Sequence, residues 1–324
     1  MKLWKKWVGM LAGLALLMGL GACTSSGNAP SAGMTMGTGG SAGTYYSFGN
    51  VLAGYMTARS GRAINVVSTD GSAANIYNVD DGVNHLATVQ SDVMAYAWDG
   101  IKSFEADGRI DSFRVIGGLY EETVQIVTLR NDIKTVADLR GKTVSVGAPG
   151  SGVYFNAMDI LGVYGMTEAD IKAEHLSFGD STDAMKDGKV DAAFIVAGAP
   201  TPAISDLAAT NAVGLVSMEE DKIAALMADS PFYTKSTVLA DTYGGMTEDA
   251  ATVSVKATMI VSADADEETV YALTAGIYEN SDAIAAAHAK GGELSLENAV
   301  TGMTVPFHPG AARYFAQNGI EVES

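Results

Sequence analysis

Short β-branched and apolar runs alternate along the chain with segments whose apolar residues recur at helical spacing. The runs that predict strands cover residues 64–67, 86–89, 113–116, 124–127, 143–146, 192–195 and 213–216. The segments that predict helices cover residues 45–59, 152–161, 182–186 and 204–210. Strands and helices in regular alternation are typical of an α/β protein with mostly parallel or mixed sheets.

The C-terminal part contains one clear amphipathic pattern. Val270, Leu273 and Ile277 fall on one helical face and follow the acidic segment 264–268. Negative charges are favourable at a helix N-terminus, so this pattern predicts a helix with an acidic start and one apolar face. We interpret the acidic segment 219–221 in the same way, as a solvated helix start.

The N-terminus has the pattern of a lipoprotein signal peptide. Three lysines precede a largely apolar stretch at 8–20, and Leu-Gly-Ala leads directly to Cys23, the only cysteine of the chain. This sequence resembles the lipobox of bacterial lipoproteins, which implies that residues 1–22 are removed and Cys23 is acylated. A chance cysteine in an ordinary signal peptide is the alternative. Residues 23–33 are small and polar and predict a flexible tether.

The composition and net charge limit the partners and ligands that the protein can bind. The formal net charge is -18, and loss of the three leader lysines takes the mature chain to -21. Such a surface repels nucleic acid and anionic lipid headgroups, so we expect no nucleic-acid partner and membrane attachment through lipid alone. An anionic ligand would need strong local hydrogen-bond donors. With no cysteine beyond Cys23, the folded part has no disulfide, and its length is enough for two domains.

Three glycine-rich segments stand between a predicted strand and a predicted helix, at 37–43, 68–75 and 147–152. The strand before the first segment, at 32–36, is weak, and this segment alone is equally consistent with a plain turn or a ligand loop. Ser72 is consistent with a helix cap or with a ligand contact. Open α/β sheets bind ligands at the carboxyl ends of their strands, so the conjunction of three such turns favours a binding cleft.

The sequence contains few patterns that are typical of catalytic or metal-binding sites. The four histidines are scattered without metal-ligand spacing. Ser151 does not stand in a hydrolase nucleophile elbow, because Pro149 replaces the glycine two positions before it. We therefore expect no enzyme activity, no cofactor and no metal. A lipoprotein hydrolase and a sensor subunit of a signalling complex remain the alternative functions.

Motifs over the whole chain after the tether closely resemble those of the TAXI family of solute receptors for TRAP transporters. They lie, in order, at 37–40 (GTGG), 43–46 (GTYY), Gly49, 71–75 (GSAAN), 90–92 (QSD), 138–147 (DLRGKTVSVG), 149–152 (PGSG), 187–194 (DGKVDAAF), 198–200 (GAP), 231–233 (PFY) and 308–315 (HPGAARYF). One residue departs from the pattern: Val153 stands where the family commonly has threonine.

The resemblance implies a two-lobed periplasmic-binding-protein fold of type II with two crossover segments and a central ligand cleft. Lobe one then holds residues 34–127 and 252–324, and lobe two holds residues 128–251. The apolar segments 124–129 and 253–260 are suited to be the hinge crossings. The implied protein is a monomer, exported and lipid-anchored to the cell membrane, in the periplasm or on the outer face. Its implied partner is a sodium-coupled TRAP membrane transporter with fused integral domains.

The implied ligand is a small organic anion, glutamate-like or a dicarboxylate, held by hydroxyls, amides and backbone N–H groups. The predicted ligand-binding residues are Thr38, Gly39, Tyr45, Ser72, Asn75, Gln90, Ser151, Gly152, Gly198, Phe232 and Tyr233. We expect Asn75 and Ser151 to contact one ligand from opposite lobes, and we expect their loss to change stability little. Tyr45 is preferred over its neighbour Tyr46.

Overall fold

The computed structural model describes residues 33–324, and Cys23, the predicted signal peptide and the tether up to residue 32 lie outside the described residues. Its strands are β1 (Met34–Gly37), β2 (Ile64–Val67), β3 (Leu86–Gln90), β4 (Phe113–Thr128), β5 (Thr143–Ser145), β6 (Lys172–Glu174), β7 (Ala192–Ala197), β8 (Gly214–Leu215), β9 (Thr234–Val238) and β10 (Ala250–Ser262). Within this range no helix has the length and apolar composition needed to cross a membrane.

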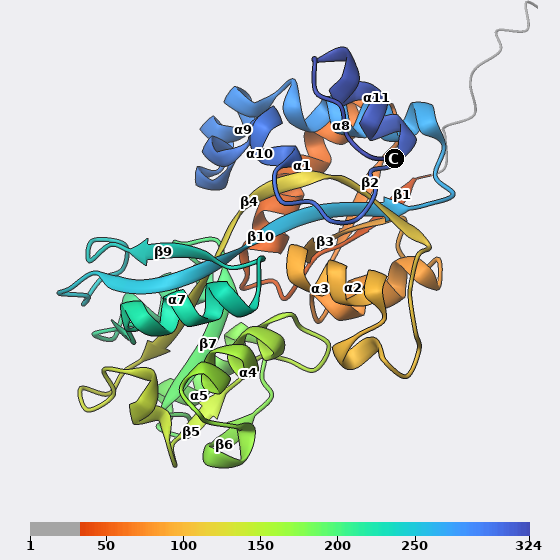
Figure 1. Cartoon of the computed structure of the whole chain (residues 1–324). Coiled ribbons are helices and arrows are strands. Elements are labelled where there is room, and N and C mark those ends of the chain that lie inside the picture. Colours follow the sequence, from red (N-terminus) through yellow and green to blue (C-terminus); the bar gives the residue numbers. More distant parts are fainter. Residues whose placement is uncertain (1–32) are drawn as a thin grey trace, which may run out of the picture. The chain divides into compact units, whose positions relative to one another are not determined.

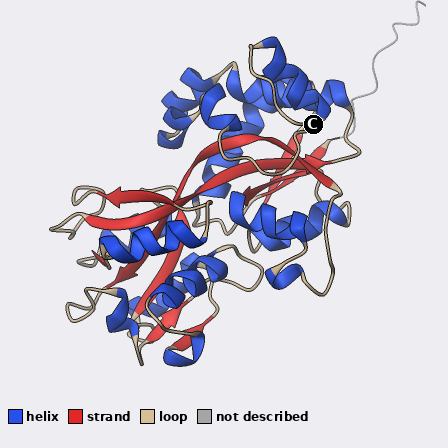
Figure 2. Cartoon of the chain, viewed as in Figure 1, coloured by secondary structure: helices blue, strands red, loops and turns tan. Residues whose placement is uncertain are grey.

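The helices cover the sheet on both sides (Figure 2). They are α1 (Thr44–Ser60), α2 (Ser72–Asp80), α3 (Ser91–Asp99), α4 (Val153–Val163), α5 (Phe178–Lys186), α6 (Pro202–Ala208), α7 (Glu220–Asp229), α8 (Glu267–Tyr278), α9 (Ser281–Ala287), α10 (Leu296–Val300) and α11 (Pro309–Gln317). Four short 3₁₀ segments complete the described helices: η1 (Lys102–Phe104), η2 (Val136–Leu139), η3 (Glu168–Asp170) and η4 (Ala289–Glu293).

Two long strands, β4 and β10, link two groups of elements (Figure 1). The strand order is β2-β1-β3-β10-β4-β7-β5-β6, with β8 paired to β4 and β9 paired to β10. In each group, short parallel strands lie beside the antiparallel long ones. The predicted two-lobed fold with two crossover segments is confirmed, since β4 and β10 pair with each other from Ser254 opposite Thr123 to Ser262 opposite Phe113.

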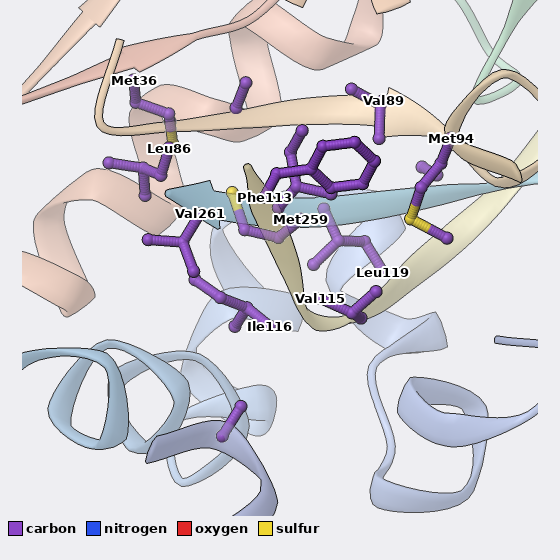
Figure 3. Packing of buried hydrophobic residues seen from close by; sticks show 14 of the residues in the cluster. Met36, Leu86, Val89, Met94, Phe113, Val115, Ile116, Leu119, Met259 and Val261 are labelled. Carbon is purple, nitrogen blue, oxygen red and sulfur yellow. The ribbon is translucent and has the colours of Figure 1, made fainter. Parts of the chain in front are cut away.

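The buried apolar residues divide at these long strands. Tyr120 belongs to the core of lobe one and Val124 to that of lobe two, and the same change occurs between Ala257 and Val255 on β10. Figure 3 shows part of the lobe-one core, where side chains from β1, β3, β4 and β10 pack together. The lobe boundaries expected from the sequence, at 127/128 and 251/252, fall within the continuous strands β4 and β10 and stay a prediction.

Three of the predicted strands differ in extent from the structure. The separate strands expected at 113–116 and 124–127 are parts of β4, because the intervening residues, acids included, continue the extended backbone. The weak strand before the first glycine segment is β1, which lies between β2 and β3. Its Met34 and Met36 are buried, so tertiary packing compensates for its poor local signal.

Two C-terminal predictions are confirmed. Val270, Leu273 and Ile277 are fully buried on α8, and the Asp266 side chain caps this helix by accepting a hydrogen bond from the Thr269 N–H. The acidic segment 219–221 begins α7. The predictions from the apolar face and from the acidic helix starts agree with the structure because burial and capping favour the same helix boundaries.

Candidate ligand-binding cleft

Loops that follow parallel strands of both lobes meet around one cavity. The loops after β1 and β2 come from lobe one, and the loop after β5 comes from lobe two. Together with the start of α5 they enclose about 450 Å³. The wall is made by Gly39, Gly40, Ser41, Ala42, Gly43, Thr44, Tyr45, Ser68, Thr69, Asp70, Gly71, Ser72, Gln90, Glu122, Ala148, Ser151, Gly152, Val153, Ser177, Phe178, Gly179, Val196 and Ala197.

The N-terminal ends of α1, α2, α4 and α5 border this cavity. The first N–H groups of a helix have no acceptor within it, and the helix dipole makes this end partly positive. No lysine, arginine or histidine lines the cavity, and its two acids are the exposed Asp70 and the buried Glu122. Residues 33–324 also contain no cluster of metal-ligating side chains. Backbone and hydroxyl donors are thus the available means of holding a negative group.

Three hydroxyl-bearing residues of the cavity wall, Tyr45, Ser72 and Ser151, are buried. Ser151 Oγ has no hydrogen-bond partner among the described residues. Ser72 Oγ accepts a hydrogen bond from the Gln90 N–H at 3.1 Å and lies beside the Tyr45 hydroxyl, which also lies beside Glu122. Buried polar groups are normally paired, so the unpaired Ser151 hydroxyl marks a place for a polar ligand.

Glu122 is the main cavity residue that the sequence reasoning missed. It lies on β4 with 2% of its surface exposed, beside the tyrosine rings of Tyr45 and Tyr120. Burial raises the pKa of Glu122 to about 8, although the two tyrosine hydroxyls act in the opposite direction. In the sequence it stands between Glu121 and Thr123, so no local pattern marks it as a cavity residue.

A hydrogen-bond network joins the lobes beside the cavity. Gln90 Nε2 of lobe one donates to Asn156 Oδ1 of lobe two at 2.7 Å, and Asn156 Nδ2 donates to Asp92 Oδ2 at 2.9 Å. The Gly150 carbonyl of lobe two accepts from the N–H groups of Ala73 and Ala74 at the start of α2, at 3.0 and 3.1 Å. These bonds hold the lobes in contact, so the described arrangement is the closed one.

Charged and aromatic groups extend this contact. Lys102 Nζ of lobe one lies 2.9 Å from both carboxylate oxygens of Asp159 in lobe two. Tyr233 Oη accepts from Asn156 Nδ2 at 2.9 Å and donates to Asp159 Oδ2 at 3.2 Å. Asp92 is fully buried, and burial raises its pKa to about 6. The network therefore contains a buried titratable group at the lobe contact.

Six of the predicted ligand-binding residues line the cavity: Gly39, Tyr45, Ser72, Gln90, Ser151 and Gly152. The structure places Phe232 and Tyr233 outside its wall. Phe232 packs edge-on against Tyr96, with ring centroids 6.0 Å apart, and Tyr233 belongs to the network between the lobes. The sequence analysis expected one of the two, Phe232 or Tyr233, near the mouth of the cleft.

Thr38, Asn75 and Gly198 lie behind the wall rather than in it. Thr38 Oγ1 donates to the Val67 carbonyl at 2.7 Å. Asn75 Nδ2 donates to the carbonyls of Thr38 and Thr88 at 2.6 and 2.8 Å. The Gly198 carbonyl of lobe two accepts from Thr44 Oγ1 at 2.8 Å. The geometry gives these residues a supporting role for the loops.

Gly152 and Val153 occupy the start of α4 at the cavity. A Cβ added to Gly152 would overlap Gln90 Oε1 and lie 3.1 Å from Ser72 Oγ, so the close approach of the lobes requires glycine. Val153 has 4% of its surface exposed and lines the same wall. Its side chain presents methyl groups where the TAXI pattern commonly has a hydroxyl.

A comparison with known protein families shows which family the chain belongs to. The sequence profile described as the NMT1-like family matches residues 36–319, which is most of the chain and both lobes. The chain belongs to the NMT1-like family. Within this NMT1-like protein, the match includes every loop that borders the cavity.

Three solved structures are similar to the NMT1-like chain over most of its length. A structure from Bordetella bronchiseptica RB50 is 16% identical, with a TM-score of 0.55 over 87% of this chain and 88% of that chain. The periplasmic aliphatic sulphonate binding protein SsuA from Escherichia coli is 19% identical, with a TM-score of 0.45 over 89% and 79%. The GluR0 ligand-binding core from Nostoc punctiforme, solved with L-glutamate, is 14% identical, with a TM-score of 0.45 over 78% and 97%.

Proposed function

We propose that this protein is an extracytoplasmic solute receptor of the TAXI type, which traps a small organic anion between its lobes. It delivers that anion to a sodium-coupled TRAP membrane transporter with fused integral domains. The observation that carries the proposal is the cavity between the lobes, whose wall contains the hydroxyl residues Tyr45, Ser72 and Ser151 and in which Ser151 Oγ has no partner among the described residues. The order of the TAXI-like motifs supports this choice of transporter class.

A binding role suits the cavity better than a catalytic one. Serine nucleophiles need a general base within hydrogen-bond reach. Ser151 Oγ has no partner among the described residues, and no histidine lines the cavity. We therefore propose that Ser151 contacts the ligand without reacting, together with Tyr45, Ser72 and the backbone of Gly39 and Gly152.

The ligand class can be tested by thermal shift. We expect at least one of succinate, glutarate, 2-oxoglutarate and L-glutamate to raise the melting temperature, because a ligand that binds only the folded state stabilises it by mass action. At a concentration 100 times the Kd, the stabilisation is about 2.7 kcal/mol. A response confined to sugars, cations or metals would contradict the proposal.

We also propose that acylated Cys23 anchors the receptor to the membrane by lipid. Cys23→Ser is expected to release the protein into the soluble fraction without changing the melting temperature of the folded part, because the thiol is used only for acylation. Membrane fractionation followed by melting of the released protein measures both effects. A Cys23→Ser variant that stays membrane-bound would refute the anchor.

A further inference from the structure

We propose that Glu122 is a ligand-binding residue that acts as a neutral carboxylic acid, donating its O–H to a carboxylate of the bound anion. The Glu122 carboxyl group therefore keeps its proton when the ligand is bound. The inference rests on the proposed function for the class of ligand, and it adds a specificity-determining residue that the family resemblance did not supply.

The placement of Glu122 is the first argument. Glu122 belongs to the cavity wall with only 2% of its surface exposed, so its carboxyl group is largely withdrawn from bulk water while it lies next to the space that a ligand would fill. The hydroxyls of Tyr45 and Tyr120 lie beside its carboxyl group and act to lower its pKa, but burial has the larger effect. A protonated Glu122 would place a carboxyl donor beside Tyr45 in the lobe-one part of the cavity wall, and Ser151 belongs to the lobe-two part of the same wall.

The surrounding charges are the second argument. The titratable groups that act on Glu122 are Tyr45 of α1, Asp92 of α3, Tyr120 of β4 and Lys290 of η4. The neighbouring β7 adds only Val196 and Ala197 to the cavity, and the β10 residue opposite Glu122 is Val255. Lys290 Nζ is already paired with Glu293 Oε1 at 2.7 Å. The exposed Asp70 adds negative charge to the cavity wall.

The charges around Glu122 favour its protonated form. No base of the cavity wall can neutralise an ionised Glu122 beside an ionised ligand, and two like charges in a buried site cannot both be ionised without a large cost. Burial already raises the pKa of Glu122 to about 8 without ligand. A bound carboxylate raises it further, so the proton stays on Glu122 in the complex.

The expected result is a loss of affinity at high pH. Succinate, glutarate and 2-oxoglutarate are fully ionised from pH 7 to 9, so only the receptor titrates. Free Glu122 must regain its proton to bind above its pKa, so the Kd of the best of these acids should rise about tenfold from pH 7 to pH 9. Calorimetry at pH 9 in two buffers of different ionisation enthalpy should show uptake of nearly one proton per ligand.

Two variants distinguish this proposal from the main alternative. In that alternative, ionised Glu122 binds an ammonium group of the ligand. Glu122→Gln keeps a neutral donor, so it should bind these acids within a few-fold of wild type at pH 7 and lose the pH dependence. Glu122→Ala should bind at least fivefold more weakly at pH 7. Glu121→Gln is the matched control, because Glu121 lies outside the cavity wall, and it should keep the wild-type pH dependence.

The outcomes are distinguishable. Binding by wild type that is constant or strengthens from pH 7 to pH 9 would overturn the role of Glu122 and leave the receptor function standing. A Glu122→Gln variant that loses binding at every pH while melting as a folded protein would overturn it as well. If none of the organic acids binds at any pH, the proposed function fails, and this inference fails with it.

Discussion

Gly152→Ala is expected to weaken ligand binding about tenfold to a hundredfold while the ligand-free protein stays folded. The added Cβ overlaps Gln90 Oε1, and Gln90 is held in place by its hydrogen bond to Asn156 across the lobes. Either the lobes stay apart or this buried bond is broken. Overpacking or loss of such a bond costs about 1–3 kcal/mol, and each 1.4 kcal/mol is a factor of ten in Kd.

Gly162→Ala on the same helix provides the control. Gly162 is exposed, and a Cβ there meets nothing within 4 Å, so this variant should bind like wild type. Gly152 has helical backbone angles, which alanine adopts without strain. Calorimetry with the organic acid found by thermal shift measures both variants. Wild-type affinity in Gly152→Ala would show that the contact between Gly152 and Gln90 is not needed for binding.

Asn75→Ala is expected to lower the free energy of unfolding by about 2–4 kcal/mol, because each buried partner left unsatisfied costs about 1–3 kcal/mol. Our sequence-based expectation of little change in stability assumed a surface loop, whereas the structure buries Asn75 completely. Asn75 is fully buried, its Nδ2 donates to the Thr38 and Thr88 carbonyls, and its Oδ1 accepts from Thr69 Oγ1 at 2.8 Å. The amide joins three segments that shape the first two loops.

Asn50→Ala is the matched control for the loss of stability expected in Asn75→Ala. Asn50 is exposed on α1 and bonds only to the Tyr46 carbonyl one turn earlier, so its removal should change stability by less than about 0.5 kcal/mol. Urea denaturation of both variants without ligand measures the difference. An Asn75→Ala variant as stable as Asn50→Ala would mean that neighbouring groups replace the lost amide bonds.

Local sequence patterns predicted the parts of the site that depend on strand-to-helix turns. The loops at 37–43, 68–75 and 147–152 all reach the cavity, because parallel strands bring their carboxyl ends to one edge of a sheet. Ser72, Ser151 and Tyr45 line the wall for this reason. The same patterns did not show that Asn75 and Thr38 turn behind the wall, since side-chain direction within a loop depends on tertiary packing.

The residues missed by the sequence analysis act across the lobes or through burial. Glu122 is an ordinary acid in the sequence, and its character comes from the tyrosine rings that enclose it. Asn156 stands on α4 with no motif around it, and it joins Gln90 and Asp92 only because the two lobes close. Contacts between residues more than 60 positions apart leave no periodic pattern for sequence reasoning to read.

Closure of two lobes around an organic anion is the central claim, and small-angle scattering of the wild-type protein tests it most directly. The radius of gyration should fall when the acid identified by thermal shift is added at saturating concentration, because the ligand gains its contacts to Ser72 and Ser151 together only in the closed arrangement. A radius of gyration that does not change on saturation with that acid would contradict the two-lobe trap.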